Sequence, residues 1–227
     1  MRLALIQPKF EFVMPYRLTP LSLSILATIA DDMFDVEIID TNFEDIEDYS
    51  RYDLVGISLN SFTAPSAYKI AFEFRKHDVP VIFGGIHPKV CYDEAKEHCD
   101  SVILGEAETV WRKALQDFSL GKLKKKYTGK YADMSKIPPV EMKYRQKSSL
   151  FYSTPLLVQT SRGCPYDCDF WSVTLFSGRK VRHRPVDEVV NEIRKSGAKS
   201  IFFVDDNLVG DFSYAKELFT ALVPLKI

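Results

Sequence analysis

The segment Val81-Ile-Phe-Gly-Gly-Ile-His-Pro88 joins a short apolar run to a pair of glycines. Four similar apolar runs occur in the first 120 residues, at Leu3–Ile6, Val36–Ile39, Leu54–Leu59 and Val102–Leu104. These runs show little apolar–polar alternation, which is typical of parallel strands buried on both faces. The stretches between them carry helical spacing, as in Ala67, Ile70, Ala71 and Phe74. Residues 1–120 therefore predict a doubly wound parallel sheet of about five strands.

Small or polar residues follow each of these predicted strands. In an open parallel sheet, ligands bind beyond the carboxyl ends of the strands. Gly84-Gly85 is the most informative of these ends, because two missing side chains let a bulky ligand lie against the backbone. A tight turn would explain this pair on its own, whereas the whole set of strand ends favours a wide, flat ligand. No Gly-x-Gly-x-x-Gly follows the first strand, so a dinucleotide site is poorly supported.

Residues 121–150 differ in composition from the segments on either side. They contain Lys122-Leu-Lys-Lys-Lys126 and Pro138-Pro139 but few apolar periods, which predicts a connection between two domains. Strand–helix alternation resumes over residues 151–227, with strands expected at Leu156–Gln159 and Ser200–Val204. Two parallel strands cannot bury both faces of a sheet. We therefore expect this part to pack on the first domain or on a separate polypeptide, or to belong to a truncated fold.

Overall composition excludes several classes of function. The formal net charge of −1 gives no basic surface of the kind that nucleic-acid binding needs. No run approaches the roughly 18 apolar residues of a membrane-spanning helix, and the apolar N-terminus is too short for a signal peptide. The chain is expected to be cytoplasmic. In that reducing compartment, the four cysteines favour metal chemistry or burial over disulfides.

A loop after the first strand of the second part carries two of these cysteines, in Arg162-Gly-Cys164-Pro-Tyr-Asp-Cys168-Asp-Phe-Trp171. Thiolates are the usual ligands of iron–sulfur clusters, although two cysteines alone are a weak signal. Zinc would ask for a second Cys/His pair, which the sequence does not show. Cys91 and Cys99 are expected to be core or surface thiols.

The cysteine loop and the strand ends together resemble radical S-adenosylmethionine proteins that carry an N-terminal B12-binding domain. The matching segments are Pro20–Leu23, Val55–Ser58, Phe83–Pro88, Leu104–Glu108, Arg162–Trp171, Arg182–Val190 and Phe203–Asn207. The resemblance covers nearly the whole chain. It implies a Rossmann/flavodoxin-like, cobalamin-binding domain over residues 1–120 and a linker over 121–150. Residues 151–227 would then form the first two βα units of a truncated radical-SAM-type (β/α) barrel.

The same resemblance implies three cofactors. Cobalamin would lie across the strand ends, with candidate contacts from Ser58, Thr63, Gly84, Gly85, Gly105 and Glu106. A [4Fe–4S] cluster on the Cys-x3-Cys-x2-Cys loop would cleave S-adenosylmethionine reductively for radical chemistry, including methyl transfer, on a substrate that no residue identifies. Candidates for the S-adenosylmethionine side are Phe170, Asp205 and Asp206. No catalytic side chain is assigned.

Two features depart from the family pattern. Trp171 stands at the third cysteine position, and an indole N–H can only donate a hydrogen bond. With Cys164 and Cys168 as the remaining thiolates, we expect a weakly held or incomplete cluster. The Asp-x-His-x-x-Gly motif, which supplies a histidine to cobalt in other B12 proteins, is also absent. His87 is expected to be a hydrogen-bonded turn residue rather than a cobalt ligand.

These departures leave three hypotheses for the chain. The first is a radical S-adenosylmethionine enzyme that is impaired by Trp171 and by a short barrel, and that would need a separate polypeptide for the remaining βα units. The second is a cobalamin-binding module without catalysis. The third is an inactive fragment of a split gene.

Overall fold

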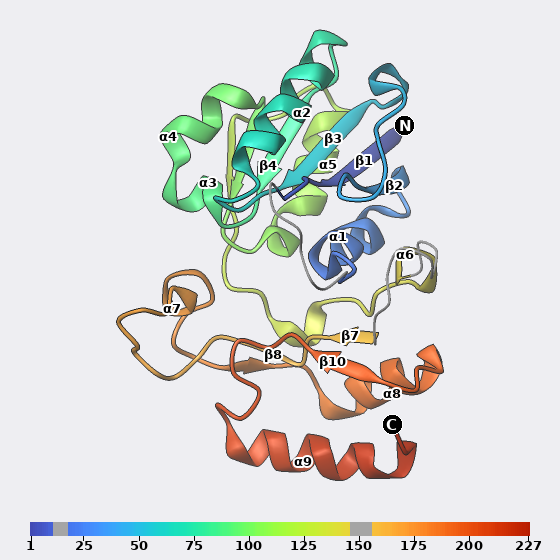
Figure 1. Cartoon of the computed structure of the whole chain (residues 1–227), viewed down its shortest axis with the longest axis vertical. Helices are drawn as coiled ribbons and strands as arrows, with labels where there is room; N and C mark the ends of the chain where they lie inside the picture. Colours follow the sequence, from blue (N-terminus) through green and yellow to red (C-terminus); the bar gives the residue numbers. More distant parts are fainter. Residues whose placement is uncertain (11–17, 146–155) are drawn as a thin grey trace.

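The computed structural model describes residues 1–10, 18–145 and 156–227. Figure 1 shows an upper part that contains the large sheet and a lower part formed by the C-terminal residues, which are drawn from yellow to red. The upper sheet has six parallel strands in the order β2-β1-β3-β4-β5-β6. Their bounds are β1 Arg2–Gln7, β2 Asp35–Asp40, β3 Leu54–Ser58, β4 Val81–Gly84, β5 Ser101–Leu104 and β6 Lys126–Thr128.

Helices cover both faces of this sheet, which confirms the doubly wound prediction. Alternate residues of a strand point to opposite faces. Leu3 and Leu5 of β1 therefore pack with helices α1 (Leu21–Ala30) and α5 (Trp111–Ser119). Ala4 and Ile6 face the other core. The helices of that face are α2 (Ala64–Lys76), α3 (His87–Val90) and α4 (Tyr92–Ala95). Elsewhere in the first domain, single 3₁₀ turns occur at Tyr49–Arg51, Lys96–His98 and Ala107–Thr109.

The segment expected to be a plain connection contributes to the fold. It supplies β6, a sixth strand beyond the five that were expected. Val102 and Leu104 of β5 pair with Lys126 and Thr128 of this strand. Further along, a small core forms against Ile25 of α1 from Ala132, Met134, Ile137 and Val140. A 3₁₀ turn at Met134–Lys136 and a short helix, α6 (Met142–Arg145), complete the segment. The expected boundary between residues 150 and 151 lies outside the described residues.

The lower part contains the two predicted strands, each followed by a helix. β7 (Leu156–Val158) pairs in parallel with β10 (Ile201–Phe203). Helices α8 (Val186–Ser196) and α9 (Phe212–Leu222) cover this pair through Val158, Val189, Ile193 and Leu218, and the last 3₁₀ turn is Val223–Leu225. Three short elements lie between β7 and α8 in the sequence. They are β8 (Ser161–Arg162), the helix α7 (Val173–Phe176) and β9 (Arg182–His183), and β8 pairs antiparallel with β9. Within the described ranges, no helix is long and apolar enough to cross a membrane.

Trp111 is the largest fully buried side chain and makes a direct test of this packing. Its indole N–H donates to the Leu26 carbonyl of α1 at 3.1 Å. A Cβ added to Gly56 of β3 would lie 3.2 Å from the indole ring and 2.9 Å from the Leu5 side chain. We expect Trp111→Ala to lower the free energy of unfolding by about 3–5 kcal/mol, because the core cannot collapse around so large a void. Urea unfolding followed by circular dichroism measures the change.

Phe72, an exposed aromatic residue on α2, provides the matched control. Phe72→Ala should change the free energy of unfolding by no more than about 0.5 kcal/mol. Equal losses in the two variants would contradict the packing described for Trp111.

Candidate functional site

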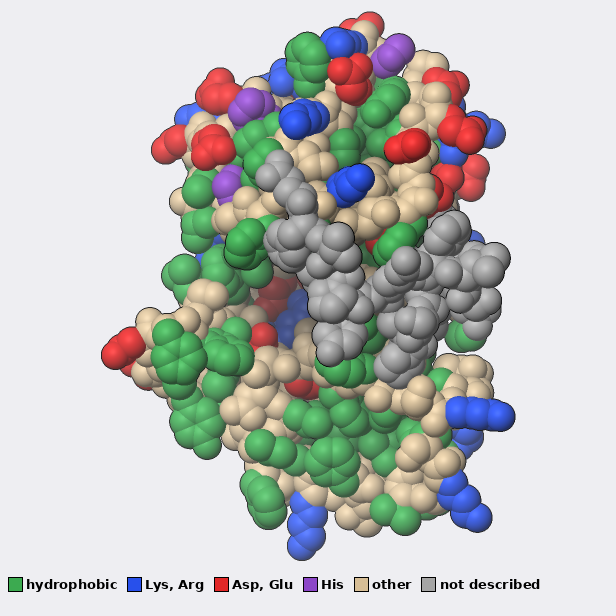
Figure 2. All heavy atoms as spheres, viewed as in Figure 1, with side chains coloured by type: hydrophobic (Ala, Val, Ile, Leu, Met, Phe, Trp, Pro, Cys, Tyr) green, Lys and Arg blue, Asp and Glu red, His purple; other side chains and the backbone are tan. Residues whose placement is uncertain are grey.

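A cavity of about 500 Å³ lies between the carboxyl edge of the large sheet and the lower part of the molecule. Figure 2 shows the surface hollowed between the two parts. The sheet contributes the ends of β3, β4 and β5 to the lining, and α1 contributes a helical wall. The lower part supplies the opposite wall, from Leu157, Gln159, Arg162, Phe176, Ser177, Val204 and Asp206. The cavity therefore lies where ligands bind in doubly wound sheets.

Glycine backbone forms the floor of this cavity. A side chain added to Gly84 would meet no atom within 4 Å, so only the absence of a Cβ leaves this space open. Gly85 has φ +102°, and a Cβ there would lie 2.5 Å from the Leu59 carbonyl oxygen. Gly105, at the end of β5, also has a positive φ. At Gly84 a ligand can approach the bare backbone, whereas Gly85 and Gly105 are required by their backbone conformation and by the close approach of Leu59 and Gly129.

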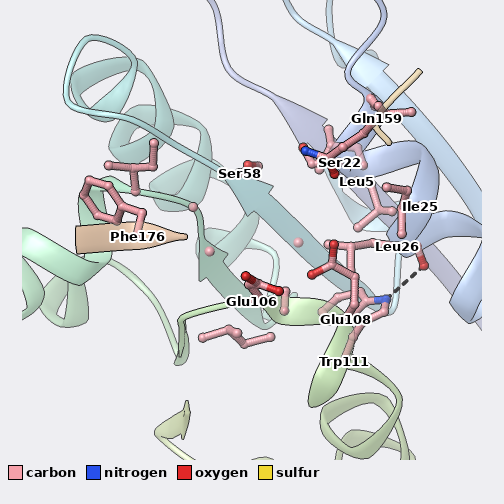
Figure 3. Close-up of a pocket in the computed structure, with 18 of the residues that line it drawn as sticks. Leu5, Ser22, Ile25, Leu26, Ser58, Glu106, Glu108, Trp111, Gln159 and Phe176 are labelled. Atoms are coloured by element: carbon pink, nitrogen blue, oxygen red, sulfur yellow. Dashed lines mark hydrogen bonds between the residues drawn. The ribbon is translucent and has the colours of Figure 1, made fainter. Parts of the chain in front are cut away.

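Apolar side chains form the helical wall. Leu21, Ile25 and Leu26 of α1 line the cavity together with Leu5 and Trp111. Figure 3 shows Glu106 between these α1 side chains on one side and Phe176 on the other. A largely apolar lining with a few placed polar groups is typical of cofactor pockets.

A buried ionic network joins the sheet to the lower part at the rim of the cavity. Glu106 follows β5, and its carboxylate accepts hydrogen bonds from Arg162 at 3.2 Å and from Arg182 at 2.5 Å. It also accepts one from the backbone N–H of Ala132 at 2.7 Å. Arg162 in turn donates to Glu108. All four charged side chains of this network are at most 15% exposed.

The charge of Glu106 is stabilised by these partners. Burial alone raises the pKa of this carboxyl, but the hydrogen bonds from Arg182 and Ala132 and the charges of Arg162 and Arg182 outweigh it. The net effect holds the pKa of Glu106 below its ordinary value. Charge-assisted pairs between guanidinium and carboxylate groups are strong and directional. Glu106 is therefore an ionised link between the two walls of the cavity.

The cysteine loop presents only part of a cluster site. The Sγ atom of Cys164 is buried and accepts from Asn207 Nδ2 at 3.6 Å, while Asp206 accepts from the Gly163 N–H at 2.8 Å. Cys168 is exposed, and the backbone N–H of Trp171 donates to its carbonyl. Across the described residues, neither cysteine belongs to a group of three close metal-binding side chains. The donor set therefore does not fit a cluster held by three thiolates.

Most of the strand-end candidates meet at the cavity. Ser58, Gly84, Gly85, Gly105 and Glu106 line it, whereas Thr63 does not. The Thr63 side chain is fully buried, and its hydroxyl holds the Asn60–Thr63 turn before α2. His87 is also absent from the lining, and its ring nitrogens contact Ser61 and Tyr68. Whether the lining residues touch a corrin ring stays a prediction.

The three candidates for the S-adenosylmethionine side separate in the structure. Asp206 lines the cavity. Asp205 instead accepts hydrogen bonds from Thr160 and Ser161, which fixes the turn between β7 and β8. Phe170 is 84% exposed and lies outside the lining. Their proposed role remains a prediction.

Sequence reasoning missed the cavity residues that come from elsewhere in the fold. No site prediction covered Trp111, Gln159, Arg162 or Phe176, all of which line the cavity. An arginine next to a cysteine loop has no periodic signal that points to a glutamate 56 positions earlier. Only the packing of the two parts brings them together.

Replacing Glu106 tests the ionic network. Glu106→Gln should lower the free energy of unfolding by about 3 kcal/mol at neutral pH, because Arg182 stays buried without its countercharge and Arg162 keeps only Glu108. The folded-state pKa of Glu106 is depressed, so its contribution is present above the unfolded pKa of about 4.3 and is lost as the pH falls through the folded value. The stability gap between wild type and variant should therefore close in acid.

Urea unfolding at a series of pH values measures this gap. Exposed Glu47→Gln is the control and should stay within about 0.5 kcal/mol of wild type. A gap of the same size at acid and neutral pH would contradict the ionised link.

Known proteins match this arrangement. Residues 12–115 match the family model of the B12 binding domain. The chain is 32% identical over 219 residues to bacteriochlorophyllide d C-12(1)-methyltransferase of Chlorobaculum tepidum, covering 92% of this chain and 48% of the relative. It is 30% identical over 189 residues to bacteriochlorophyllide d C-8(2)-methyltransferase of the same organism, covering 81% of this chain and 42% of the relative. The chain thus spans about half the length of the curated relatives it matches.

A solved structure shows the same fold over nearly the whole chain. The radical S-adenosylmethionine methyltransferase TsrM of Kitasatospora setae, with cobalamin and a [4Fe-4S] cluster bound, superposes with a TM-score of 0.74. The match covers 99% of this chain and 52% of TsrM at 19% identity. At that identity, the likeness speaks for the fold alone. Taken with the matches in sequence, these findings show that the chain is a B12-binding-domain protein related to methyltransferases, with the fold of the first half of a radical S-adenosylmethionine methyltransferase that binds cobalamin.

Proposed function

We propose that the chain binds cobalamin in the cavity at the carboxyl edge of the large sheet. The observation that carries this proposal is the open floor at Gly84, where any side chain would enter the space. Gly85 and Gly105 extend the same bare backbone along neighbouring strand ends. The floor belongs to the region that matches the B12 binding domain. A flat macrocycle is the class of ligand that such a floor suits.

The chain's own residues would hold the ligand in three ways. Backbone at Gly84 and Gly85 would support one face of the ring. Leu21, Ile25 and Trp111 would exclude water from one side, because their side chains line the cavity with apolar surface. Arg162, fixed by Glu106 and Glu108, would keep the lower wall in place over the ring.

Methyl transfer is the activity that the relatives favour. Both Chlorobaculum tepidum relatives are methyltransferases by name. Bound cobalamin would supply a cobalt centre that can carry a methyl group. We assign this carrier role to the cobalamin of the present chain, with Asp206 and Gln159 of the lower wall facing the space beside it.

A cobalamin-binding module without radical chemistry is the second candidate, and Trp171 favours it. Two thiolates, of which Cys168 is exposed, leave a four-iron cluster short of a protein ligand. S-adenosylmethionine cleavage by such a cluster is therefore no part of this second candidate function. The two candidates share the cobalamin site and differ only in the cysteine loop.

Side chains placed on Gly84 test the cobalamin site. The position has free space above it and no positive φ, so the variants should fold normally. Gly84→Phe should weaken cobalamin binding at least tenfold by filling the floor, and Gly84→Ala should weaken it less. Spectroscopic titration of the full chain and retention of corrinoid on gel filtration measure binding. No binding to wild type, or equal binding to all three proteins, would remove cobalamin from this cavity.

Iron uptake distinguishes the two candidate functions. After anaerobic reconstitution with iron and sulfide, wild type should hold fewer than four irons per chain. Trp171→Cys should raise the iron content and the characteristic visible absorption, because it restores a third thiolate at a partly exposed position. Trp171→Ser is the control without a thiolate and should match wild type. A full four-iron cluster in wild type would show that the loop needs no third cysteine.

A further inference from the structure

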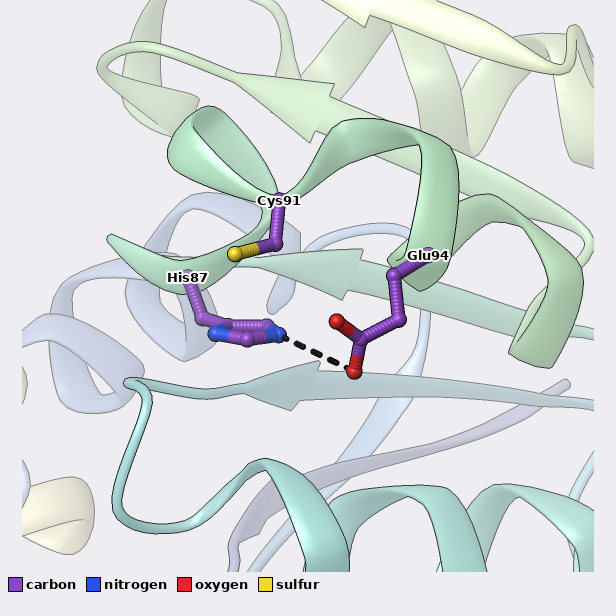
Figure 4. Close-up of side chains that lie close together, drawn as sticks. All are labelled: His87, Cys91 and Glu94. Atoms are coloured by element: carbon purple, nitrogen blue, oxygen red, sulfur yellow. Dashed lines mark ion pairs between the residues drawn. The ribbon is translucent and has the colours of Figure 1, made fainter.

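A second group of metal-binding side chains lies near the cavity without lining it. His87, Cys91 and Glu94 come from α3, the junction of α3 with α4, and α4. One ligand atom from each lies within 4.8 Å of the others, and Figure 4 shows the three side chains turned toward one another. The distance from His87 Nε2 to Glu94 Oε1 is 3.9 Å. None of the three belongs to the cavity lining described above.

These residues occupy positions i, i+4 and i+7 of two successive short helices. The backbone leaves the helical conformation at Cys91, between α3 and α4, and the three side chains gather on one face of this segment. The face is turned toward α2, because Tyr68 of that helix contacts the His87 ring. Residues on other positions of the same segment, Ile86 and Lys89, line the cavity instead.

His87 is held as a metal-binding histidine usually is. The Tyr68 hydroxyl of α2 lies 2.8 Å from His87 Nε2. The Ser61 hydroxyl lies 3.2 Å from Nδ1 on the other side of the ring. Both ring nitrogens therefore have a hydroxyl neighbour from outside α3, and the tautomer of His87 sets which group donates in each pair. A metal-ligating histidine characteristically donates its other N–H to such a partner.

We propose that His87, Cys91 and Glu94 bind a divalent transition-metal ion of the zinc class. Imidazole, thiolate and carboxylate are the three ligand types that zinc takes, and three protein ligands leave a fourth position for water or the Tyr68 oxygen. Metal–ligand bonds of about 2.0–2.3 Å place neighbouring ligand atoms about 3.5 Å apart in a tetrahedral site. The group therefore closes around an ion with small side-chain movements. Glu94 is 55% exposed and free to make the largest of them.

The ion would fix the turn that carries the cavity floor. The backbone N–H of His87 donates to the Leu59 carbonyl at 3.2 Å, and Gly85 packs against the same carbonyl. A metal bond to the His87 ring would tie this turn to α4. Gly84 and Gly85, which lie three and two residues before His87, would then be held more firmly in place.

Cobalt titration tests the site, because Co²⁺ takes the place of zinc and absorbs light when a thiolate is bound. Reduced, metal-free full chain should bind one Co²⁺ with a thiolate-to-cobalt charge-transfer band, and Zn²⁺ should displace it. Cys91→Ser should abolish the band. The double variant Cys164→Ser/Cys168→Ser should keep it, which separates this site from the cysteine loop.

Two further substitutions examine the other parts of the site. Glu94→Gln should weaken Co²⁺ binding at least tenfold, whereas Glu97→Gln, which is exposed on the adjacent turn, should not change it. Ser61→Ala should weaken binding about tenfold, because His87 loses the partner that orients its ring.

The proposal is overturned by any of three results: no band in wild type, a band that survives in Cys91→Ser, or a band lost only in the double variant. Circular dichroism of each variant checks its folding. His87 is buried, and replacing it would disturb folding. The test therefore relies on Cys91→Ser, because Cys91 is partly exposed and its replacement should leave the fold intact.

Discussion

The buried carboxylate of Glu106 is the interaction on which the arrangement of the two parts depends. It stands at the end of β5, where the sheet offers its carboxyl edge, and it binds guanidinium groups from β8 and β9. A buried charge without partners is very costly. Separating the two parts would leave the Glu106 carboxylate without the guanidinium groups of Arg162 and Arg182, which opposes their separation. This link helps to hold the lower wall of the cavity over the strand ends.

Much of the first domain could be predicted because its signals are local. Apolar runs without apolar–polar alternation predicted five strands. The residues that follow these runs included five that line the cavity. Thr63 was misleading, since a threonine after a strand is equally suited to hold a turn, and here its hydroxyl does so. β6 was missed because three residues beginning with a lysine carry too little apolar character to stand out from a basic run.

The rest of the site could not be read from the sequence because it depends on contacts between distant segments. Arg162 and Phe176 reach the cavity only after the lower part has packed against the sheet. The segment expected to be a plain linker hides a core of its own, formed by Met134, Ile137 and Val140 against α1. That core helps to set the position of the lower part. Apolar residues spaced irregularly among prolines give no periodic pattern, so their burial is visible only in three dimensions.

The chain contains two tryptophans, and they occupy opposite environments. Trp111 is buried against the cavity, whereas Trp171 lies partly exposed on the cysteine loop. Their fluorescence should therefore differ in colour, with the emission of Trp111 at shorter wavelength. A coloured ligand that enters the cavity would quench Trp111 first by energy transfer, while iron at the loop would quench Trp171. The protein thus carries one optical reporter beside the cavity and another on the cysteine loop.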